Sequence, residues 1–212
     1  MSKLDTTMMY AIHDALRREL QRIARITARP NDDPRRILRT AAGWEMFKTY
    51  LRVHHTSEDD ALWPEMHQAL ADRPADLALL DAMEAEHAAI DPLLAGIDAA
   101  LADRESGPER LGDLVDALHT GLSGHLRHEE DEGLKLIDAT LTEQQWQRFG
   151  QLHGTRVGAD ASRYLPWVLD GMNAERIAII VGRMPEPIRT AYENEWRKAY
   201  AELDLWKARS HT

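Results

Sequence analysis

Six histidine and glutamate residues stand out in this sequence because their spacing occurs twice. They are His13, His54, Glu58, His87, His125 and Glu129. Each half has a lone histidine followed by an HxxxE pair, and the same interval separates the two paired histidines as separates the two glutamates. A helix places side chains four residues apart on one face. Since imidazole and carboxylate are common metal ligands, the repeat predicts two matching halves of one metal site.

Positioning these side chains requires helices, and the apolar residues around them recur at helical spacing of three and four. The predicted helices cover Thr7–Ala28, a segment from Pro34 through Met66, Pro74–Arg104 and Pro108–Thr140. Pro64 should bend or weaken the second of them. Four amphipathic helices with short connections predict an all-α fold, an antiparallel up-down four-helix bundle.

The chain divides by this pattern into a bundle, residues 1–140, and a C-terminal extension, residues 141–212. In the extension we expect helices over Thr142–Tyr164, Glu175–Met184 and Pro187–Ala208. No part of it is low in complexity, so the extension should pack on the bundle. Its role is not defined by the sequence; a helical buttress, a dimer surface, an end cap and the wall of a substrate channel are the alternatives.

All six repeated residues fall on the apolar stripes of their helices. Burying two carboxylates and four imidazoles without partners could cost on the order of ten kcal/mol. A whole domain is stable by only about 5–15 kcal/mol. A buried polar network or a metal centre must therefore compensate, and six residues at matching offsets favour a metal.

The donor set narrows the choice of metal. Four nitrogens and two carboxylates exceed the four ligands of one zinc ion and are too rich in nitrogen for calcium or magnesium. Imidazole with carboxylate suits two iron ions, and suits manganese less well. Each ion can receive two histidines, with Glu58 and Glu129 placed to bridge.

The remaining histidines have weaker claims. His55 lies about 100° around the helix from His54 and could be an alternative ligand or a group that orients one. Glu84, three residues before His87, is a candidate acceptor that orients that histidine. We expect four others at the surface: His67, His119, His153 and His211.

Composition excludes several function classes for this chain of 212 residues. A net charge of -10 argues against nucleic acid and anionic membranes as partners. The absence of cysteine excludes disulfides, iron-sulfur clusters and thiol nucleophiles. The N-terminus lacks the apolar stretch of a signal peptide, so we expect a cytoplasmic protein. It would be a monomer or a homodimer.

The motifs resemble the hemerythrin-like family, or HHE cation-binding domain. The resemblance spans about Met9 to Leu136, through IHDALRREL, HHTSEDDALWP, EHAAIDPLL and HLRHEEDEGL. It implies a four-helix bundle with a non-haem di-iron centre that has an oxo or hydroxo bridge (Fe–O–Fe) and bridging carboxylates. Oxygen carriers of this family have a second histidine four residues after the one on the third helix. Here that position is Asp91, a candidate for orienting a ligand rather than binding the metal, and the site resembles the bacterial four-His, two-Glu type.

Two classes of function compete. With fewer protein ligands, an open coordination position would favour oxidoreductase-type or detoxifying reactions with dioxygen, peroxide or nitric oxide. The alternative is reversible binding of dioxygen or nitric oxide, storage, or iron or oxygen sensing without turnover. Hydrolysis is more remote and would need zinc or magnesium. The runner-up fold is the ferritin-like di-iron bundle, of whose paired ExxH motif the chain has only Glu84 to His87.

Overall fold

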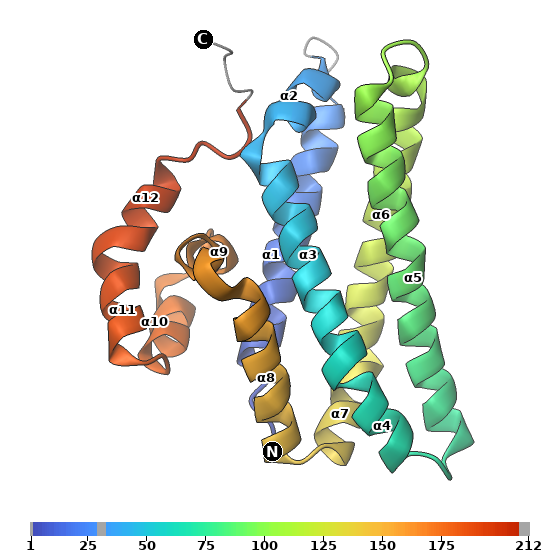
Figure 1. The fold of residues 1–212 in the computed structure, drawn as a ribbon, viewed down its shortest axis with the longest axis vertical. Coiled ribbons are helices and arrows are strands. Elements are labelled where there is room, and N and C mark those ends of the chain that lie inside the picture. The colour runs from blue at the N-terminus through green and yellow to red at the C-terminus, as the bar shows by residue number, and fades with distance from the viewer. Residues whose placement is uncertain (1, 29–32, 208–212) are drawn as a thin grey trace.

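A computed structural model describes residues 2–28 and 33–207, which form helices and turns without β-strands (Figure 1). The bundle contains α1 (Thr7–Thr27), α2 (Pro34–Thr40), α3 (Ala42–Ala61), α4 (Trp63–Ala69), α5 (Pro74–Ala102), α6 (Gly107–His128), the π-helix η1 (Glu129–Gly133) and α7 (Leu134–Thr140). The extension contains α8 (Glu143–Val157), the 3-10 turn η2 (Gly158–Asp160), α9 (Ala161–Leu169), α10 (Ala174–Gly182), α11 (Glu186–Ala191), the π-helix η3 (Tyr192–Trp196) and α12 (Arg197–Ala201). The predicted all-α class is confirmed.

Helices α1, α3, α5 and α6 run up, down, up and down, so that neighbours in sequence are antiparallel (Figure 1). The apolar stripes explain this packing. On α5, for example, Leu80, Met83, Ile90, Leu94 and Ile97 recur at steps of three and four or their sums, and all are buried. The four long helices therefore turn their stripes towards a common interior.

The second predicted helix is divided in the structure. Helix α2 is capped by Asp33, whose side chain accepts from the Arg35 amide at 3.1 Å. Ala41 then adopts an extended backbone with ψ 125°, and α3 starts after it. The Gly43 amide donates to the Leu205 carbonyl at 2.8 Å. Since this partner comes from the far end of the described chain, the break could not be predicted from local periodicity. Pro64 lies in the first turn of α4, at the predicted bend.

The first expected helix of the extension is also divided, whereas the last is continuous but shorter than predicted. Gly158, with φ +51° and ψ −127°, ends α8 and leads through η2 into α9, where a helix to Tyr164 was predicted. The last expected helix is α11, η3 and α12, and it ends at Ala201. Its predicted end at Ala208 lies outside the described residues.

Two apolar clusters occupy the interior, one towards each end of the bundle. On α1, Met9 belongs to the lower cluster and Leu16 to the upper one. On α5 the corresponding residues are Met83 and Ile90. His13 and His87 lie between these pairs in sequence, so the repeated polar residues form a layer between two dry clusters.

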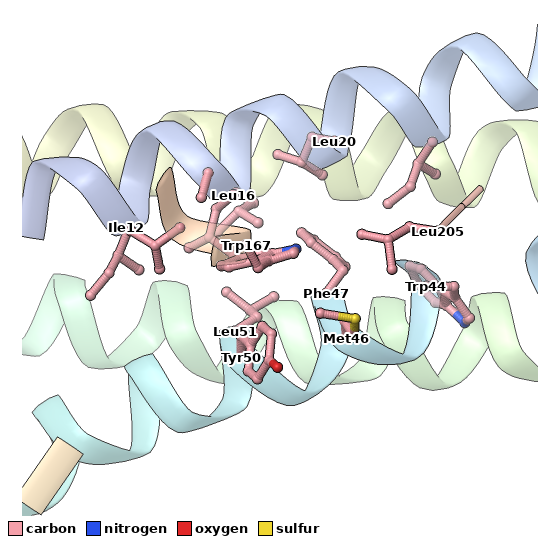
Figure 2. Packing of buried hydrophobic residues seen from close by; sticks show 14 of the residues in the cluster. Ile12, Leu16, Leu20, Trp44, Met46, Phe47, Tyr50, Leu51, Trp167 and Leu205 are labelled. Atoms are coloured by element: carbon pink, nitrogen blue, oxygen red, sulfur yellow. The ribbon is translucent and has the colours of Figure 1, made fainter. Parts of the chain in front are cut away.

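The extension packs against α1 and α3. Helix α8 runs beside the lower half of α3 (Figure 1), and α9 contacts α1. Trp167 of α9 is fully buried, and Figure 2 shows it between Leu16 of α1 and Leu51 of α3. The extension thus contributes directly to the upper core. Within the described residues, no helix combines the length and the apolar character needed to cross a membrane.

Candidate metal centre

The structure brings the six repeated residues together in the polar layer. His13 comes from α1, His54 and Glu58 from α3, His87 from α5, His125 from α6 and Glu129 from the start of η1. Four of the six are 0 % exposed, and the most exposed, His87, is at 6 %. The predicted grouping is therefore present in space, across all four bundle helices.

The π-helix η1, which follows α6, positions Glu129 in this layer. A π turn inserts one extra residue into a helix and often occurs at functional sites. Gly133, at the end of η1, leaves room for the Glu129 side chain, because a Cβ there would approach Glu129 Cγ to 3.1 Å. The sequence stripe did not predict this turn, although it placed Glu129 correctly on the inner face.

Within the polar layer the candidate ligand atoms form two groups, and the atoms of each group lie within 4.8 Å of one another. The first contains His13, His54, Glu58 and Glu129, and the second contains His55, His87 and His125. In each group two imidazoles meet: His13 Nε2 lies 3.1 Å from His54 Nε2, and His87 Nε2 lies 3.1 Å from His125 Nε2. Two nitrogens bound to one ion at about 2.1 Å, at right angles, would be about 3 Å apart. The spacing of both pairs suits a shared ion.

Three carboxylates orient three of these histidines. His87 Nδ1 donates to Asp59 at 2.8 Å, His125 Nδ1 to Glu86 at 3.0 Å and His13 Nδ1 to Glu130 at 2.9 Å, with the proton placed on Nδ1. Such acceptors fix the tautomer of a metal-binding histidine and leave the Nε2 lone pair free. The lone pairs of His87 and His125 then face each other, which is unfavourable unless a cation lies between them.

The three acceptors were missed in the sequence, but they share a signal. Asp59 follows Glu58, Glu86 precedes His87 and Glu130 follows Glu129, so each is the neighbour of a candidate ligand. A neighbouring residue projects about 100° away, towards the next helix. Asp59 of α3 thus reaches α5, Glu86 of α5 reaches α6, and Glu130 of η1 reaches α1. His54 is the exception, because its Nδ1 is buried and has no hydrogen bond to any residue that the structure describes.

Arg17 supports the acceptor on α1. Its guanidinium donates to both oxygens of Glu130 at 2.8 Å. Although burial raises the pKa of Glu130, its bonds to His13 and Arg17 outweigh this and lower the pKa to about 2. Glu130 therefore stays ionised and holds the His13 ring in place.

Glu58 and Glu129 lie between the two histidine groups. Glu58 Oε1 is 3.5 Å from His54 Nδ1, while its Oε2 is 3.5 Å from His87 Nε2. Glu129 Oε2 is 3.1 Å from His13 Nε2 and 3.8 Å from His125 Nε2. All four carboxylate oxygens are buried without a hydrogen-bond partner among the described residues. Each carboxylate thus lies near histidine nitrogens of both groups.

Without bound metal, the buried groups of the layer have strongly shifted pKa values. Burial, and then the charge of Glu129, raise the pKa of Glu58 well above its usual value. Burial opposes protonation of His13, but Glu129 and Glu130 raise its pKa to about 9. Burial and neighbouring histidines hold the pKa values of His54 and His55 well below 6.5. Without metal, the layer thus holds neutral His54 and His55 and one ion pair, His13 with Glu129. Metal binding releases the proton of such a histidine, and the neutral imidazoles and carboxylates that result are the form that metal ligands take, so the residues fit bound cations.

Two candidate orienting residues lie elsewhere. Glu84 is half-exposed and pairs with His67 at 3.3 Å, while Asp59 occupies the position beside His87 that we had predicted for it. Asp91 is exposed at the rim of a pocket and makes no hydrogen bond or ion pair within the described part of the chain. Neither carboxylate contacts a candidate ligand directly within the described residues, because the outer flank of α5 faces solvent here rather than a neighbouring helix.

Among the histidines expected at the surface, His153 is buried. It lies on α8 at 8 % exposure, and its Nε2 is 3.3 Å from the Tyr164 hydroxyl. Burial lowers its pKa to about 4, and the charge of Arg156 acts in the same direction. The prediction failed because α9 folds back over α8. His67 and His119 are partly exposed, and His211 lies outside the described residues.

One side of the layer meets solvent through a pocket of about 240 Å³ between α3 and α5. His55 and His87 lie at its base, with Arg52, Asp59, Glu84 and Asp91 among its walls. All four members of the first histidine group, by contrast, are 0 % exposed. The layer is therefore asymmetric, with a sealed group and a group next to a pocket.

Comparison with known proteins agrees with this geometry. A family profile described as the hemerythrin HHE cation binding domain matches residues 4–137, well over half of the chain. Searches of curated proteins and of solved structures gave no significant match. The matched residues contain all six repeated ligand candidates and the helices that carry them, and we conclude that this chain belongs to the hemerythrin HHE cation-binding family.

Proposed function

We propose that this protein binds two non-haem iron ions and reacts with dioxygen, hydrogen peroxide or nitric oxide in an oxidoreductase-type or detoxifying role. His13 and His54 would hold one ion, and His87 and His125 the other, with Glu58 and Glu129 between them. One observation carries the proposal: two buried carboxylates without hydrogen bonds separate two opposed pairs of imidazole nitrogens. Manganese and zinc suit this donor set less well.

When bound, an iron pair supplies the electrons for reduction of a small oxidant. The protein holds and orients the ligands through Asp59, Glu86 and Glu130. The apolar clusters on both sides exclude water, which strengthens every charge interaction in the layer. Arg17 keeps Glu130 ionised, so the His13 ring cannot turn away.

The pocket favours small neutral reactants. Asp59, Glu84 and Asp91 line it with three acidic groups against the single cation of Arg52. A net negative entrance repels anions and leaves neutral molecules unaffected. Dioxygen, nitric oxide and hydrogen peroxide are all neutral at pH 7. The cytoplasmic location, the monomeric or homodimeric state and the absence of nucleic-acid and membrane partners remain proposals from the sequence.

The test is a single turnover of the reduced protein. Anaerobic protein loaded with ferrous iron is mixed with dioxygen, hydrogen peroxide or nitric oxide, and consumption of the reactant and optical spectra are followed. We expect consumption in proportion to bound iron and much faster than in Glu129→Gln protein. Slow autoxidation alone would contradict the proposal. A stable adduct that releases its ligand when the gas is removed would instead favour binding or sensing.

A further inference from the structure

His55 is not one of the six repeated residues, yet the structure places it inside the second histidine group. It is 7 % exposed, and its ring stacks on that of His87 with centroids 3.9 Å apart and planes inclined by 8°. The ring of His125 lies 5.1 Å away in an edge arrangement. His54 points towards α1 and His55 towards α5, so consecutive residues of one helix reach both groups.

The nitrogen atoms of His55 make it more than a packing residue. Its Nε2 is buried and has no hydrogen-bond partner among the described residues. Leaving a buried polar atom unpaired costs about 1–3 kcal/mol. Asp59 and Glu86, the carboxylates nearest to this group, already accept from His87 and His125. Both carboxylates therefore already have a histidine partner, and Nε2 of His55 has none among the described residues.

The position of His55 suits a ligand. One nitrogen of His55 lies within 4.8 Å of ligand atoms from His87 and His125. Asp91, by contrast, is exposed at the pocket rim and lies outside this group.

We propose that His55 is a direct metal ligand, the third imidazole of the ion held by His87 and His125. The inference rests on the proposed dinuclear site and deepens it. It makes the two ions unequal: three imidazoles for the ion beside the pocket, and two for the sealed ion at His13 and His54.

The test counts bound ions in variants that keep the packing. His55→Phe retains a flat ring that can stack on His87 but has no nitrogen, and His55→Gln is a second variant in case the first does not fold. Metal-free proteins are checked by circular dichroism and then titrated with cobalt(II), whose visible absorption reports the number and type of ligands. His153→Phe is the matched control, because His153 is similarly buried, at 8 %, but lies on α8.

We expect wild type and His153→Phe to bind two cobalt ions. In the His55 variants the affinity for one ion should fall by more than about 100-fold, beyond the 10–100-fold typical of a residue that only orients a ligand. Binding of the other ion should be unaffected. In a further variant, His55→Gly, added imidazole should restore binding of the ion held by His87 and His125. If the folded His55 variants bind two ions with unchanged absorption, His55 is not a ligand, while the dinuclear proposal still stands. Fewer than two ions in wild type would overturn the dinuclear proposal and this inference together.

Discussion

Two regions of this molecule bury glutamates completely, and they differ in the hydrogen-bond partners that they give to the carboxylate oxygens. Glu19 on α1 is 0 % exposed, and its oxygens accept from Arg18 Nε at 2.8 Å, Arg22 Nη1 at 2.9 Å and Trp206 Nε1 at 2.8 Å. Glu58 and Glu129 are equally buried, but none of their oxygens has a hydrogen bond within the described structure.

The difference shows what the metal layer lacks. At Glu19 the protein supplies the compensating cations itself, as expected for a buried charge. At Glu58 and Glu129 it supplies imidazoles instead, most of them neutral, with their free nitrogens directed inwards. Glu19 and its two arginines lie on α1, the helix that also carries His13. The lack of an arginine partner is therefore specific to the carboxylates of the metal layer. We propose that bound metal supplies the positive charge that arginines supply at Glu19.

Metal removal should produce the largest effect. A ligand present at about a thousand times its dissociation constant stabilises the folded state by about 4 kcal/mol, so each bound ion should contribute on that scale. Urea unfolding of metal-loaded and chelated protein measures the difference. Equal unfolding free energies would show that the layer is a metal-independent polar network.

Glu19→Gln should destabilise the protein by about 3 kcal/mol, since it leaves Arg18 and Arg22 without their shared carboxylate. The loss should be the same with and without metal, and the bound metal per chain should not change. Arg18 also donates to the carbonyls of Trp167 and Asp170 at 2.6 and 2.5 Å, so α9 should loosen. Hydrogen exchange would reveal this. A fall in metal content would mean that the two regions are coupled.

Asp59→Asn, Glu86→Gln and Glu130→Gln should each weaken metal binding by about 10–100-fold, or roughly 1.4–2.8 kcal/mol. The amide accepts a weaker bond from Nδ1 and lets the ring turn. Competition with a chelator of known affinity measures the change. Asp98→Asn is the control, because Asp98 binds Trp44 and Lys48 away from the layer. An equal loss in that control would assign the effect to general instability.

The smallest expected effect is a gain in stability, whereas the preceding effects are losses. In metal-free protein, Glu58→Gln should raise the free energy of unfolding by about 1–2 kcal/mol, because it removes a buried carboxylate that has no partner. The same change should abolish binding of the second ion. Stability measured by urea and metal content by elemental analysis should therefore move in opposite directions. Destabilisation of the metal-free protein would show that Glu58 has a structural partner, as Glu19 has.

Sequence patterns predicted the bundle and the six inward residues because helical periodicity is a local property. The stripe of α5, from Leu80 to Leu101, is buried as expected. The break at Ala41 and the acceptor roles of Asp59 and Glu86 depend instead on contacts between distant segments. His55 was ambiguous for the same reason, since a position 100° from His54 is inside or outside according to how α5 approaches. The ligand roles themselves remain predictions.

Anomalous diffraction at the iron absorption edge from crystals of iron-loaded protein tests the central claim most directly. We predict two iron peaks between Glu58 and Glu129, one beside His13 and His54 and the other beside His87 and His125. A single peak, or iron located away from these carboxylates, would contradict the account.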